Sequence, residues 1–121
     1  MSIYLKILVG FIAIEHLFIL WIEMFSWTKM GKKMFRSIDQ DLFERTKVLA
    51  ANQGLYNGFL AAGLIWAIFI ENSIWSYNIA TFFLSCVVIA GTYGSITSSK
   101  SILFKQAMPA ALVLMILIAT R

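Results

Sequence analysis

Three ionisable side chains, Glu15, His16 and Glu23, interrupt an apolar run near the start of the chain. A carboxyl group beside an imidazole can carry a proton, act as a general acid–base pair or hold a cation. At about 100° per residue, His16 and Glu23 differ by about 20° around a helix, and Glu15 and Glu23 by about 80°. The spacing therefore predicts one broad polar face on a buried helix.

A second polar group lies in the next apolar stretch, at Asn52, Gln53, Tyr56 and Asn57. We estimate depth by placing Ser26 and Lys47 at one level and counting about 1.5 Å per residue. The deep layer predicted in this way contains Glu15, His16, Tyr56 and Asn57. The shallow layer contains Glu23, Asn52 and Gln53. The carboxamides are then expected to bond the buried carboxyl groups and the histidine.

A purely structural role for these residues stays open. Hydrogen bonds between membrane helices stabilise their packing by about 0.6 kcal/mol on average, so the cluster could serve only as helix–helix contact. His16 could equally be a core residue whose hydrogen bonds are satisfied locally.

The composition indicates a lipid environment. The chain has 121 residues, of which 60% are hydrophobic and 13% charged, whereas soluble domains carry about 25% charged residues. A single cysteine, Cys86, excludes an intrachain disulfide, and no Cys/His spacing suggests a metal site. The net charge of +4 is concentrated at 29–47, beside apolar segments, so we expect no nucleic acid partner.

Four apolar segments each approach the roughly 20 residues that a helix needs to cross a bilayer. We expect an all-α, single-domain protein over 1–121, an antiparallel bundle of four transmembrane helices. The expected helices cover about 3–26, 39–70, 74–96 and 102–120. Ser37 followed by Gln40 fits a capping box, which predicts that the second helix begins near Asp39. Pro109 should leave the Lys105 carbonyl without its helical partner.

The orientation follows from the basic residues. Six of the ten lie in the first connection, at 28–47, while the second connection carries only Glu71 and the third carries Lys100 with Lys105 just beyond. Because basic connections stay in the cytoplasm, the long first connection and the third should lie there, with both termini outside. Anionic lipid is a possible contact for the first connection.

Several short motifs carry a family resemblance: "EH" at 15–16, "EMF" at 23–25, "KVLAANQGLYNGFLAAGLIW" at 47–66, "AGTYG" at 90–94, and Gln106 with Pro109. Together they resemble the domain-of-unknown-function 1304 family of small bacterial four-helix membrane proteins. The resemblance implies a multi-pass protein of the bacterial cell (inner) membrane and supplies no activity or cofactor.

A fainter resemblance is to the membrane-associated eicosanoid and glutathione metabolism proteins. Those proteins also have four helices, a large cytoplasmic first loop and outward termini. Arg45 and Lys47 open the second helix here, and Tyr56–Asn57 stands where that family has Glu–Asn. The resemblance implies a trimer with its site between protomers.

The chain has no Gly-rich phosphate loop and no nucleophile elbow, which argues against the chemistries of soluble enzymes. Three functions stay open. The favoured one is an intramembrane polar pocket between the first two helices that binds a small or lipophilic ligand or performs acid–base chemistry. The alternatives are an oligomeric proton-linked permease for small solutes and a structural or accessory membrane subunit. The expected partners are the lipid bilayer and further copies of the chain.

Overall fold

The computed structural model describes residues 1–121, and its regular elements are all helical, which confirms the predicted all-α class. The elements are α1 (Ile3–Phe25), η1 (Trp27–Gly31), α2 (Lys32–Met34), α3 (Leu42–Arg45), α4 (Lys47–Phe69), α5 (Ser73–Thr97), η2 (Leu103–Ala107) and α6 (Met108–Ala119). The two η elements are single π-helical turns.

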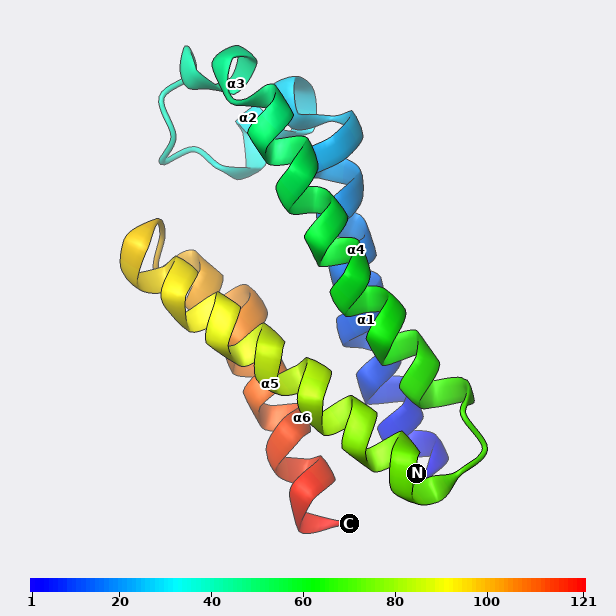
Figure 1. The fold of residues 1–121 in the computed structure, drawn as a ribbon. Helices are drawn as coiled ribbons and strands as arrows, with labels where there is room; N and C mark the ends of the chain where they lie inside the picture. Colours follow the sequence, from blue (N-terminus) through cyan, green and yellow to red (C-terminus); the bar gives the residue numbers. More distant parts are fainter.

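The long helices are arranged as two pairs (Figure 1). In one pair α1 runs beside α4, and in the other α5 runs beside α6. The pairs meet at the end of the molecule that holds both termini and diverge toward the end that holds α2 and α3. The two chain ends therefore lie at the same end of the molecule.

Glycines set the contact between α1 and α4. A methyl group added at Gly54 would lie 3.0 Å from Glu23 Cβ, and one added at Gly58 would lie 2.5 Å from Leu20 Cδ1. Small residues four apart allow helix backbones to approach in this way. The close approach fixes the register of the two helices, because it places Gly54 against the turn that carries Glu23.

The apolar core lies where the two pairs meet. Its thirteen buried side chains are Leu5, Val9, Ile12, Ala13, Leu64, Ala67, Ile79, Ala80, Leu84, Val87, Ala110, Val113 and Leu117. The Ser76 hydroxyl donates a buried 2.7 Å hydrogen bond to the Ala67 carbonyl and ties α5 to α4 beside this core. The end of the molecule that holds both termini, which we call the closed end, is thus held together by a packed apolar core.

The first connection differs from the prediction. The helix expected from Asp39 is divided into α3 and α4 at Thr46, and α3 has no side-chain cap. The predicted capping box of Ser37 and Gln40 is therefore wrong. Thr46 lies between the two helices, and its hydroxyl donates to the Leu42 carbonyl and accepts a 3.0 Å hydrogen bond from Trp27 Nε1.

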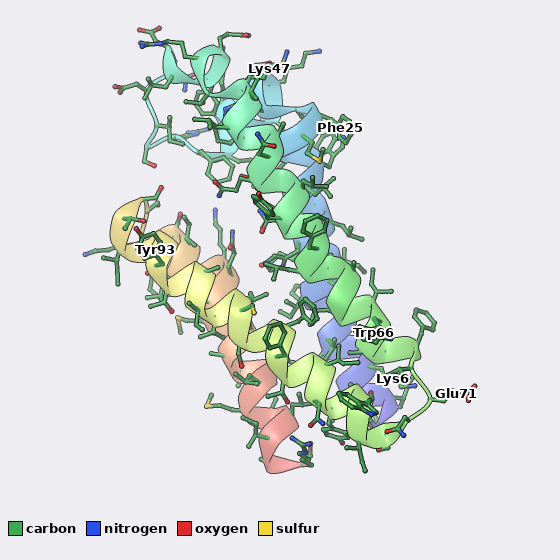
Figure 2. All side chains as sticks on the ribbon, in the orientation of Figure 1. Lys6, Phe25, Lys47, Trp66, Glu71 and Tyr93 are labelled. Atoms are coloured by element: carbon green, nitrogen blue, oxygen red, sulfur yellow. The ribbon has the colours of Figure 1, made fainter.

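Two of the helices, α1 and α5, are long and apolar enough to cross a membrane, and the last helical stretch, Leu103–Ala119, is apolar but shorter. Charged side chains mark the ends of the long helices. Figure 2 shows Lys47 close to the end that carries α2 and α3, and Lys6 and Glu71 at the opposite end.

Candidate functional site

Glu23 and Asn57 form the polar contact that joins α1 to α4. Asn57 Nδ2 donates a 2.5 Å hydrogen bond to Glu23 Oε1. Glu23 is only 5% exposed. A buried carboxyl group needs hydrogen-bond donors, and this carboxamide supplies one. The prediction that a carboxamide of the second long helix would meet an acidic side chain of the first is realised at this pair.

A cavity of about 230 Å³ adjoins this pair, and we call it the Glu23 cavity. Its polar lining residues are Glu23, Gln53, Tyr56, Asn57 and Gln106. It therefore gathers one carboxyl and three carboxamide side chains from α1, α4 and η2. Such a set can donate and accept several hydrogen bonds to one small polar group.

Glu15 lines a second cavity, of about 370 Å³, which we call the Glu15 cavity. Most of its wall is apolar or aromatic, including Phe11, Phe18 and Pro109, and Lys105 adds a cation. Glu15 Oε1 is buried and has no hydrogen-bond partner. Buried polar atoms in native proteins are almost always bonded, so this oxygen is suited to accept a hydrogen bond from a ligand or from water.

The two cavities adjoin and form one interhelical cleft between the helix pairs. Both are lined by Ile19, Phe35, Ile102 and Gln106. Small-molecule sites typically have volumes of about 300–1,000 Å³. The Glu15 cavity, of about 370 Å³, lies within this range, and the Glu23 cavity, of about 230 Å³, lies just below it. The cleft combines an apolar wall with a few convergent polar groups, which is the usual make-up of a ligand pocket.

The π-turn η2 carries Gln106. Pro109 has no N–H to donate to the Lys105 carbonyl, so the α-helical pattern cannot continue there. The Met108 N–H instead bonds the Leu103 carbonyl, five residues back. The wider turn gives Gln106 a place in both cavities. Such π-turns occur frequently at functional sites.

The predicted deep layer does not assemble. His16 is 1% exposed and its Nδ1 bonds the carbonyl of Ile12, one turn back, at 2.9 Å. It lines neither cavity, so the local, structural interpretation of this histidine is the one that the geometry matches. Tyr56 lies at the Glu23 cavity but is 64% exposed, and Glu15 faces the third connection instead.

The predicted shallow layer forms in part. Glu23 and Gln53 share a cavity, but Asn52 is exposed and bonds only the Val48 carbonyl of its own helix, at 3.1 Å. Asn52 does not join them because it lies about 100° from Gln53 around α4. Asn57, which was predicted at a deeper level, meets Glu23 because the register differs from the prediction. Placing Ser26 level with Lys47 puts Glu23 level with Ala50, whereas in the structure Glu23 contacts Gly54, so α4 is shifted by about four residues, or about 6 Å. Asn57 is thereby brought to Glu23.

Lys105 and Gln106 were not predicted as site residues. Lys105 entered only as a basic charge and as the carbonyl freed by Pro109, although both residues line the Glu15 cavity. The sequence signal for Gln106 was its position in an apolar helix, three residues before Pro109. A carboxamide there can hydrogen-bond either the backbone carbonyl that the proline leaves free or a ligand. The sequence did not distinguish these two roles.

Residues 10–118 match the family described as "Protein of unknown function (DUF1304)". The chain is also similar to "Uncharacterized protein YpaA" of Lactococcus lactis subsp. lactis (strain IL1403), with 32% identity over 108 residues, covering 88% of this chain and 89% of that relative. No solved structure matches. The resemblance predicted from the sequence motifs is confirmed, and the chain belongs to the DUF1304 family.

Proposed function

We propose that the protein is a multi-pass protein of the bacterial inner membrane that binds a small or lipophilic ligand in the interhelical cleft. The observation that carries the proposal is the unpartnered, buried Oε1 atom of Glu15 in an otherwise largely apolar cavity next to Glu23 and Gln106. Two carboxyl groups near one cleft also supply the groups for acid–base chemistry on the bound molecule.

The proposed topology has four membrane crossings, made by α1, α4, α5 and the η2–α6 stretch. Support comes from large apolar side chains that each of them exposes, such as Phe11, Phe59, Phe82 and Leu112. A soluble protein rarely exposes so much contiguous apolar surface. The basic first and third connections would then lie in the cytoplasm, with both termini outside. The cleft would open toward the cytoplasmic end.

The test of ligand binding is a variant that fills the cleft. Ile102 lines both cavities, whereas Ile89 is exposed and lines neither cavity. We expect native mass spectrometry of the purified protein to detect a bound molecule of defined mass. Ile102→Trp should release it and Ile89→Trp should retain it. A wild-type protein without any such molecule, or equal loss in both variants, would refute the proposal.

The two alternative functions predict different results. A proton-linked permease, which would need several copies around a path, would move solute or protons in proteoliposomes under a pH gradient. An accessory subunit would tolerate Glu15→Gln without a phenotype as long as the protein accumulates. Ligand binding is favoured over both because the polar groups face a cleft of ligand size within one chain.

A further inference from the structure

A third cavity lies at the mouth of the cleft, where the first and third connections approach each other. Its volume is about 520 Å³. Its polar lining residues are Lys33, Arg36, Ser37, Ser99, Ser101 and Lys105. No carboxylate lines it. We call it the basic cavity, and its donors all suit an anion.

The basic cavity is continuous with the apolar Glu15 cavity. Met34, Phe35, Ser101 and Lys105 line both of them. Cationic and hydroxyl groups at the mouth therefore lead directly to a wall of aromatic and aliphatic side chains. A molecule that fills both must have an anionic head and an apolar body.

The charge of the mouth restricts the head group further. Three basic side chains, Lys33, Arg36 and Lys105, line it. A phosphate monoester carries about −1.5 to −2 charges near neutral pH and has three strong acceptor oxygens. A diester carries about one negative charge and balances three cations less well. Arginine and lysine beside hydroxyl donors are the usual partners of phosphate groups.

The location agrees with a lipid as the source of the phosphate. In the proposed topology both connections lie at the cytoplasmic surface, where basic pockets between helices recognise anionic head groups. We propose that the cleft holds a lipid with a terminal phosphate monoester, its phosphate in the basic cavity and its chain along the apolar wall of the Glu15 cavity, with water as the donor to Glu15. This inference rests on the proposed function and names the ligand class of the same cleft.

The experiment uses the full-length protein in nanodiscs of neutral lipid and three probes. These are dioleoyl phosphatidic acid, dioleoyl phosphatidylcholine with the same chains, and inorganic phosphate. The test variant is Lys33→Gln with Lys105→Gln. The matched control is Lys29→Gln with Lys100→Gln, which removes the same charge at exposed residues outside the basic cavity.

We expect the wild-type protein to bind about one phosphatidic acid per chain and to prefer it to phosphatidylcholine. Each basic group near a lipid phosphate contributes a factor of roughly five, so the test variant, which loses two, should bind about twenty-five-fold more weakly. The control should change binding by less than about threefold. All four lysines are exposed, so both variants should fold.

Three results would overturn the inference. Equal weakening in the two variants would indicate general surface attraction. Equal binding of the two lipids would exclude phosphate recognition. Full competition by inorganic phosphate would indicate an anion site without lipid. In each case a bound molecule that Ile102→Trp releases would still support the proposed function, so the two failures are distinguishable.

Discussion

Replacing Asn57 by alanine removes the donor that Glu23 has across the α1–α4 contact. Because Glu23 is almost fully buried, its carboxyl group would lose a hydrogen bond from a buried donor. Leaving a buried acceptor unsatisfied costs about 1–3 kcal/mol, and hydrogen bonds in membrane proteins reach at most about 1.7 kcal/mol. We therefore expect a loss of about 1–2 kcal/mol in the free energy of unfolding.

The same chain offers a matched control at Asn52. This residue lies on the same helix, is exposed, and bonds only its own backbone turn. Alanine raises helix propensity equally at the two positions, so that contribution cancels in the comparison. Asn52→Ala should change stability by less than about 0.5 kcal/mol.

The assay is unfolding in mixed micelles by titration with SDS, followed by far-UV circular dichroism. A Glu23→Leu background completes a double-mutant cycle, in which Asn57→Ala should cost little, since its partner is gone. Equal effects of the two asparagine substitutions, or an unchanged cost of Asn57→Ala in the Glu23→Leu background, would show that the contact does not hold α1 to α4.

Two further predictions concern packing within the helix pairs and at the closed end. Gly91→Ala would place its Cβ 2.9 Å from the Ala107 backbone nitrogen, so we expect a loss of about 1–3 kcal/mol in the free energy of unfolding. Gly94→Ala is the control, because its Cβ would make only ordinary contact and should leave the melting temperature nearly unchanged. A larger effect at Gly94 than at Gly91 would contradict the α5–η2 packing. Ser76→Ala removes the buried hydrogen bond to the Ala67 carbonyl and should cost about 1 kcal/mol in the same unfolding assay, and an unchanged stability would count against that bond.

Sequence reasoning was most successful where a single segment decides the outcome. Long apolar runs predicted the long helices, and the proline at 109 predicted a disturbed backbone near Lys105, which the structure realises as η2. It failed at Ser37, where the capping signal was local but the chain is held instead by Trp27 and Thr46, a pair nineteen residues apart.

The candidate site was predicted in part for the same reason. Glu15 and Glu23 do line the cleft, and Gln53 and Asn57 join Glu23. His16 and Asn52 line neither cavity, and each bonds a carbonyl of its own helix. The helical spacing predicts the face of the helix on which a side chain lies, but its polar group can still hydrogen-bond a backbone carbonyl one turn back.

The amino-acid sequence by itself determined the helical class, the family and the residues available for chemistry, since hydrophobic run length and residue type are properties of each segment alone. Only the tertiary structure decided which polar groups meet. The level of α4 against α1 depends on the approach allowed by Gly54 and Gly58, and the placement of Lys105 and Gln106 beside Glu15 depends on how the second helix pair diverges from the first. These are packing distances between segments far apart in the chain, and no local pattern encodes them.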